Sequence, residues 1–259
     1  SVCTKEPYVI CDPETFDDET ELFFDEEDAK KEAERLAGEK IPVTVIKLEN
    51  SQMLPFYTSL YTMGINALLV CEEDEKTMVQ LTDFVRRKKN EEIPEGKVWV
   101  ENPALHLTAL YFLQEARRKP AQEMSEETKG MQEELLAHFT QGRYIFPIRK
   151  DGKGVPLARL GNGDTYQPIF TDILEFQKFN KDDQLKGVVV DAAKIPQVLS
   201  SEAKGVLLNL MGINLPLPIR RKTPAGAAGA AASGQAPADT ASPKENGTEE
   251  KAPAEEKQQ

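Results

Sequence analysis

The chain has 259 residues and a formal net charge of −12, from 44 acidic and 32 basic side chains. Nucleic acids and anionic lipid surfaces attract clustered Lys and Arg, so this charge argues against both kinds of partner. No apolar run approaches the roughly 20 residues that a membrane-spanning helix requires, which argues against a membrane protein.

The first part of the chain alternates short apolar runs with polar segments, which predicts strands and helices in turn. Strands are expected at residues 7–11, 21–24, 41–48 and 65–71. Asp25 precedes a run of acids and then bases that stops at Gly38, the pattern of a capped helix. A second helix is expected to end at Gly64.

The middle of the chain predicts mostly helix. Residues 77–89 read as a short strand running into a helix, and Ser125 opens a helix that stops at Gly142. Between them, Asn102 stands at a cap position and Pro103 in the first turn of a helix that continues to residue 118.

The helix over 103–118 is apolar nearly all round, and a helix of that kind is usually buried on several sides. In one interpretation it is wedged between the two halves of this molecule. In the other, part of it faces another protein or a second copy of the chain. The second interpretation assigns an interaction surface to Leu107, Tyr111 and Phe112.

The second half carries the clearest hairpin signals. Strands over 143–150, 155–160 and 165–170 are separated by Asp-Gly and Asn-Gly turns, which predicts an antiparallel meander. Thr171 is expected to cap the next helix, with Asp172 adding negative charge at its start. Ile173, Phe176 and Phe179 recur at helical spacing and are expected to face the sheet. The next strand, 186–192, is expected to be central in its sheet. Gly212 is expected to mark a tight turn in the last strand segment.

The last segment, residues 223–259, has no aromatic residue and no Ile, Leu, Val or Met. It cannot bury enough apolar surface to offset its ordering entropy, so it is predicted to be disordered. A short Ala-rich helix over 225–232 is the alternative, and Gly226 and Gly229 argue against it.

The tetrapeptide Met-Gly-Ile-Asn occurs twice, at Met63–Asn66 and at Met211–Asn214. In both halves a strand, a Phe and Asp step and a helix precede it. This predicts a diverged internal duplication, in which residues 1–100 and 125–222 are related sheet-and-helix units and 101–124 hold the linking helix. The predicted fold class is α+β with antiparallel meander strands and a disordered tail.

No motif carries a recognisable chemistry. His106 and His138 have no zinc-ligand spacing, and Ser200 and Ser201 have no Gly-flanked elbow. The acidic run over 12–28 lacks the sixth-position glycine of a calcium loop. We therefore predict no catalytic residue, no cofactor and no metal.

Three cysteines, Cys3, Cys11 and Cys71, form no C-x-x-C pair and leave an odd count. This is typical of a reducing compartment, so a cytoplasmic protein with incidental thiols is expected. A reactive cysteine is the alternative. No signal peptide is visible, although the chain begins at Ser1 without a Met.

The second half resembles the SseB N-terminal domain family, named for an enhanced serine sensitivity phenotype. The residues that carry the resemblance are "EELLAHF" with "YIFPI", "PIFTD", "GVVVDAAKIPQVL" and "GVLLNLMGINLPL". The match covers about 130–218 and, more faintly, 7–71, and Leu210 stands where the family usually has Pro. The resemblance implies an α+β domain of a cytoplasmic bacterial protein and no established catalytic residue. Its motif residues are expected to be structural: Phe170, Thr171, Asp172, Asn209 and Gly212.

The function predicted from these observations is a non-enzymatic protein-interaction or regulatory module. Its expected partner is another protein or a second copy of the chain, with no nucleic acid, membrane or metal. The alternative is a small-ligand binder or an enzyme whose site lies between the two units and uses Asp172, Tyr166 or Cys71.

Overall fold

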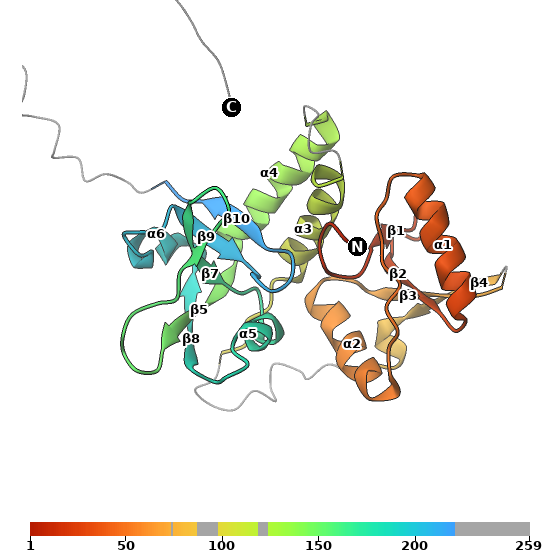
Figure 1. The fold of residues 1–259 in the computed structure, drawn as a ribbon, viewed down its shortest axis with the longest axis horizontal. Helices are drawn as coiled ribbons and strands as arrows, with labels where there is room; N and C mark the ends of the chain where they lie inside the picture. The colour runs from red at the N-terminus through yellow and green to blue at the C-terminus, as the bar shows by residue number, and fades with distance from the viewer. Residues whose placement is uncertain (74, 87–97, 119–123, 221–259) are drawn as a thin grey trace, which may run out of the picture. The chain divides into compact units, whose positions relative to one another are not determined.

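The computed structural model describes residues 1–73, 75–86, 98–118 and 124–220 (Figure 1). The fold is α+β, as the sequence predicts. Residues 1–222 group into one unit, and the segment 223–259, predicted to be disordered, lies outside the described residues. Within the described ranges, no helix has the length and apolar character needed to cross a membrane.

The first half forms a four-stranded sheet in the order β1-β2-β3-β4 (Figure 1). Only β2 and β3 run parallel. Asp25 caps α1 as predicted, because its carboxylate accepts from the amides of Glu27 and Asp28. The elements are β1 (Ile10–Cys11), β2 (Asp18–Phe23), α1 (Glu26–Gly38), α2 (Asn50–Thr62), β3 (Ala67–Glu72), β4 (Glu75–Gln80) and a 3-10 turn, η1 (Leu81–Asp83).

The strand predicted over 41–48 is wrong. This segment belongs to no sheet, and Ile46 is 75% exposed. Its β-branched residues favour a strand, but a strand also needs a neighbour with which to share backbone hydrogen bonds. The segment pairs with neither edge strand of the first sheet, β1 or β4.

Two helices follow, α3 (Pro103–Ala116) and α4 (Glu126–Gln141), and they pack against each other. The Ser125 hydroxyl caps α4 by accepting from the Thr128 amide. Asn102 stands at the N-cap position of α3, but its side chain does not cap the helix. Its amide instead donates to the carbonyl oxygens of Arg143 and Thr171, at 2.7 and 2.8 Å, which ties the start of α3 to the second half.

The second half contains a sheet in the order β10-β9-β7-β6 and a pair β5-β8, joined where Ile145 and Phe170 exchange two hydrogen bonds of 3.0 Å. The β6–β7 pair is antiparallel as predicted, while β5 pairs along its full length with β8. The elements are β5 (Arg143–Arg149), β6 (Ala158–Arg159), β7 (Thr165–Ile169), α5 (Ile173–Phe179), β8 (Leu185–Asp191), η3 (Ala192–Lys194), α6 (Ile195–Val198), β9 (Gly205–Leu208) and β10 (Leu215–Pro218).

Two expectations for this half are wrong. The strand predicted as central, β8, lies at an edge, and its residues 186–189 are all exposed. Ile173 does not face the sheet, since it is 44% exposed, whereas Phe176 is buried. A strand that is apolar in sequence is thus not necessarily covered on both sides. Periodicity reports only which positions share a face.

One hydrophobic core joins both halves through α3. The cluster includes Leu60 and Leu68 from the first half and Ile169 and Leu208 from the second. Between them α3 supplies Leu105, Ala109, Leu110 and Leu113. The apolar helix is therefore buried between the two halves of the molecule.

The internal duplication stays a prediction. Each half has a strand, an Asp-capped helix and a later strand parallel to the first: β2, α1 and β3, then β7, α5 and β9. The two Met-Gly-Ile-Asn words, however, stand at different points of this arrangement. The word at 63–66 precedes the parallel strand β3, whereas the word at 211–214 follows the parallel strand β9 and leads into antiparallel β10.

Candidate functional site

The three side chains of α3 predicted to face a partner are partly buried. Leu107, Tyr111 and Phe112 all pack against the core. The Tyr111 hydroxyl donates to Asp18 Oδ1 at 2.5 Å, and burial together with this bond raises the pKa of Tyr111. Contacts within the chain thus account for the apolar character of α3, and a partner would meet only the parts of these side chains that the core leaves uncovered.

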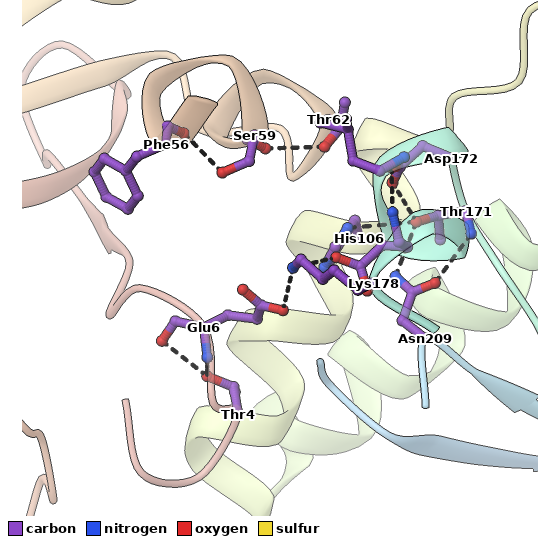
Figure 2. Close-up of polar contacts among 12 residues, drawn as sticks. Thr4, Glu6, Phe56, Ser59, Thr62, His106, Thr171, Asp172, Lys178 and Asn209 are labelled. Atoms are coloured by element: carbon purple, nitrogen blue, oxygen red, sulfur yellow. Dashed lines mark hydrogen bonds and ion pairs between the residues drawn. The ribbon is translucent and has the colours of Figure 1, made fainter. Parts of the chain in front are cut away.

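Four of the five motif residues lie together in the interior, where β7 and β9 end and α5 begins. Three of them, Thr171, Asp172 and Asn209, are labelled in Figure 2. The side-chain oxygen of Asn209 accepts from the Thr171 amide at 3.0 Å, and its side-chain nitrogen donates to the Thr171 hydroxyl at 2.8 Å. That hydroxyl donates to Asp172 Oδ2 at 2.7 Å. Phe170 packs beside them against Phe176, with ring centroids 5.6 Å apart.

The residue that caps α5 is Asp172, which corrects the prediction that Thr171 does so. Asp172 Oδ1 accepts from the amides of Leu174 and Glu175, at 2.9 and 3.0 Å. Thr171 stands one position before the N-cap, and its hydroxyl accepts from Asn209 and donates to Asp172. The local cap pattern cannot reveal a partner 38 residues further along the chain.

Gly212, the fifth motif residue, lies in a turn as predicted, since its amide donates to Asn209 O at 2.9 Å, and its position also has no space for a side chain. The left-handed backbone positions of this corner belong to Asn209 and Asn214, with φ of 47° and 49°. A Cβ on Gly212 would lie 2.2 Å from Glu6 Oε1 and 3.1 Å from Glu175 Oε2. The glycine therefore makes room for two carboxylates that arrive from distant parts of the sequence.

These two carboxylates share one ammonium group (Figure 2). Lys178 Nζ lies 3.0 Å from Glu6 Oε1 and 2.5 Å from Glu175 Oε1. Glu6 and Glu175 are 8% and 2% exposed, and among the described residues no donor binds Glu175 Oε2. A buried carboxylate oxygen without a partner is costly, so this arrangement is one of the least favourable polar contacts in the fold.

Burial shifts the protonation of the whole cluster. It raises the pKa of Glu6, of Glu175 and of Asp172, the last to about 6, although hydrogen bonds from Glu175 N and Thr171 oppose the shift at Asp172. Burial lowers the pKa of the His106 imidazole to about 3, so this side chain is neutral. Burial would also lower the pKa of Lys178, but the two glutamates raise it above its usual value.

Asp172→Asn is expected to remove a loss of stability that the wild type shows as pH rises. The folded pKa of Asp172, about 6, exceeds the unfolded value of 3.8, so the protonated carboxyl stabilises the fold. This stabilisation is fully present below about pH 3.8 and is lost as pH rises through 6. The shift corresponds to roughly 3 kcal/mol. Urea unfolding between pH 4 and 7.5 measures the difference between wild type and variant.

The matched control is Asp25→Asn, since Asp25 caps α1 through the same two kinds of bond but is exposed. Asn keeps the cap in both variants. A stability difference between wild type and Asp172→Asn that does not change with pH, as expected for the control, would contradict burial of an ionisable carboxylate at Asp172.

The residues of the alternative ligand site are not brought together. Cys71 lines a depression of about 500 Å³ with Phe23 and charged side chains of α1, while Tyr166 is buried on β7. The three cations that line this depression are paired: Lys31 with Asp28, Arg35 with Glu32 and Lys76 with Glu21. Burial raises the pKa of Cys71 to about 11, so its thiol is protonated at neutral pH.

The other residues considered as candidates from the sequence are the cysteines, His138 and the acidic run over 12–28. Cys3, Cys11 and Cys71 are free thiols. His138 lies 3.3 Å from Glu134 on α4 and borders a depression of about 170 Å³. In the acidic run, Asp12 closes a turn by accepting from two backbone amides. In the part of the chain that the structure describes, no group of three His, Cys, Asp or Glu is placed to hold a metal ion.

No protein-family model, curated protein or solved structure matches this chain.

Proposed function

We propose that this protein is a non-enzymatic interaction module that binds an extended segment of a partner protein along the free edge of β8. The observation that carries the proposal is an edge strand of seven residues whose centre, Gly187 to Val189, is exposed on a sheet that ends there (Figure 1). Val188 and Val189 are each 36% exposed. An exposed apolar edge is a template for strand addition.

The other sheet edges carry features that discourage pairing. The opposite edge of the second sheet, β10, contains Pro216 and Pro218, which cannot donate to a ladder. In the first sheet, β1 has only two residues and β4 begins with Glu75 and Lys76. Short strands, proline and charge are the usual protections of an edge, and the central residues of β8 have none of them.

The register between β5 and β8 determines which backbone amide and carbonyl groups of β8 do not bond to β5. Ala192 N donates to Gly142 O at 3.0 Å and Lys150 N to Gln184 O at 3.1 Å, so even-numbered residues of β8 bond to β5. The odd-numbered residues therefore point their amide and carbonyl groups outward. The Asn180 side chain already binds both groups of Leu185, which leaves those of Gly187 and Val189 for a partner.

The partner that fits this edge is an extended segment with apolar side chains and a carboxylate near one end. Lys186 on β8 and Arg149 on the neighbouring end of β5 are exposed, and neither forms an ion pair with another described residue. Main-chain hydrogen bonds to Gly187 and Val189 would supply affinity. The two cations would favour an acidic residue at that end of the segment.

Val189→Pro is expected to abolish this binding and to leave the β5–β8 ladder intact, since the amide of Val189 faces outward. Peptides selected from a random heptapeptide phage library against the full chain should bind the wild type at least tenfold more tightly than this variant. They should shift the amide signals of Gly187 and Val189 in an NMR titration.

The control is Val189→Thr, which keeps the amide and the β-branched shape and should bind the selected peptides as the wild type does. Peptides that bind Val189→Pro as tightly as the wild type, or a library that yields no binder, would overturn the proposal. If sedimentation at two concentrations shows a dimer that Val189→Pro dissociates, the extended segment belongs to a second copy of the chain and a separate partner is excluded.

The resemblance to the SseB N-terminal domain family and the location in a bacterial cytoplasm belong to the same proposal. Support for the resemblance comes from the motif residues, because Thr171, Asp172 and Asn209 bind one another in the interior as expected of structural positions. Support for a reducing compartment comes from the three free cysteines.

A further inference from the structure

The contacts of Glu6 point to a second device, which uses residues far from β8 and does not depend on the proposed function. Glu6 lies on the segment that precedes β1, whereas Glu175 and Lys178 lie on α5. Lys178 is 172 positions further along the chain than Glu6. The ion pair between Lys178 and Glu6 links this segment to α5 (Figure 2), while the ion pair between Lys178 and Glu175 lies within the helix.

We propose that Glu6, Glu175 and Lys178 form a latch that holds the segment 1–9 on α5 in mildly acidic solution and releases it as pH rises. The latch buries two carboxylates on one ammonium, and Glu175 Oε2 has no donor among the described residues. A proton on either carboxylate removes the excess negative charge. Ionisation of both favours the state in which Glu6 returns to solvent.

Within the described residues, three further titratable groups surround the latch. Asp172, at the start of α5, adds a third carboxylate, and its charge raises the pKa of Glu6. His106 on α3 is neutral and therefore does not offset this charge. The amino group of Ser1 donates to the Glu6 carbonyl oxygen at 2.7 Å, and its charge lowers the pKa of Glu6 without cancelling the effect of burial.

The remaining contacts of the segment do not depend on carboxylate protonation. Arg117 on α3 donates to the carbonyl oxygens of Cys3 and Asn214, each at 2.8 Å. Gln114 binds the amide and the carbonyl of Val9, at 2.9 and 3.1 Å. These bonds, together with the one that Val2 N donates to Pro42 O at 3.0 Å, hold the segment at Val2, Cys3 and Val9, so release is expected to be local and to involve the residues around Glu6.

Hydrogen–deuterium exchange of the full chain tests the latch. Corrected for the intrinsic exchange rate, the peptide that covers residues 1–9 is expected to be protected several-fold more at pH 5 than at pH 8. Peptides from α3 serve as the internal reference, because their protection follows the global stability, which also changes with the ionisation of Asp172; the protection of 1–9 is expected to fall several-fold relative to theirs.

Glu175→Gln keeps the size and the acceptor of the side chain but removes its charge, so protection of 1–9 relative to α3 should become independent of pH. Glu202→Gln, at an exposed position outside the cluster, should leave the pH dependence unchanged. Equal protection of 1–9 relative to α3 at both pH values in the wild type would overturn the latch. So would a relative pH dependence that persists in Glu175→Gln.

Discussion

Phe170→Ala is expected to lower the free energy of unfolding by roughly 3–5 kcal/mol, the range for truncating a buried aromatic side chain. Phe170 is completely buried at the junction of β7 and α5. It stacks near Phe176 and Phe179, with ring centroids 5.6 and 5.3 Å away, and packs with Ile145 of β5. The loss leaves a cavity that the surrounding sheet and helix cannot close. Urea unfolding followed by circular dichroism measures it.

The matched control is Ile173→Ala, three residues further along the chain. Sequence periodicity predicts that Ile173 faces the sheet, but it is 44% exposed. We expect a change below about 1 kcal/mol, which is usual for an exposed position. Equal losses at the two positions would contradict the orientation of α5, because the two side chains would then have to share the core.

Lys178→Met is expected to destabilise the fold by roughly 2–3 kcal/mol at pH 8. Removing one partner of a buried ion pair costs about 3–5 kcal/mol, and the lower value allows for the 36% exposure of the Lys178 side chain. The variant leaves Glu6 and Glu175 together without a cation. Protonation relieves their repulsion, so the loss measured by urea unfolding should be smaller at pH 5 than at pH 8.

The double variant Glu6→Gln with Lys178→Met is the control for this effect. Neutralising Glu6 leaves a single buried charge in place of two, so a substantial part of the stability lost in Lys178→Met should return at pH 8. A double variant that is less stable than Lys178→Met would show that Glu6 does not repel Glu175, and that the cost of Lys178→Met arises from lost packing of the lysine stem.

Local patterns in the sequence were enough to predict the α+β class and most element positions, because caps and turns act over a few residues. Asp25 and Ser125 cap the helices that their spacing predicts, and the Asn-Gly turn joins an antiparallel pair. The segment 41–48 shows the limit of this approach. Its β-branched residues favour a strand, but no neighbouring strand is placed beside it in the sheet.

The motif residues show the same division. Phe170, Thr171, Asp172, Asn209 and Gly212 were predicted as structural positions, and the first four bind or pack together. Their individual roles were predicted only in part, because Thr171 takes its partner from Asn209 and Gly212, in its predicted turn, also makes room for Glu6. A pattern over four residues contains no information about a side chain that arrives from another part of the chain.

The sequence by itself determined most of the helices and strands, the helix that is apolar all round, and a formal net charge of −12. Only the tertiary structure decided that β8 ends a sheet, that α3 is covered from both halves, and that Glu6 meets Glu175 and Lys178. The physical reason is range. Helix caps and turns depend on neighbours in the chain, whereas sheet edges, burial and ion pairs such as that of Glu6 with Lys178 depend on groups that meet only when the chain has folded.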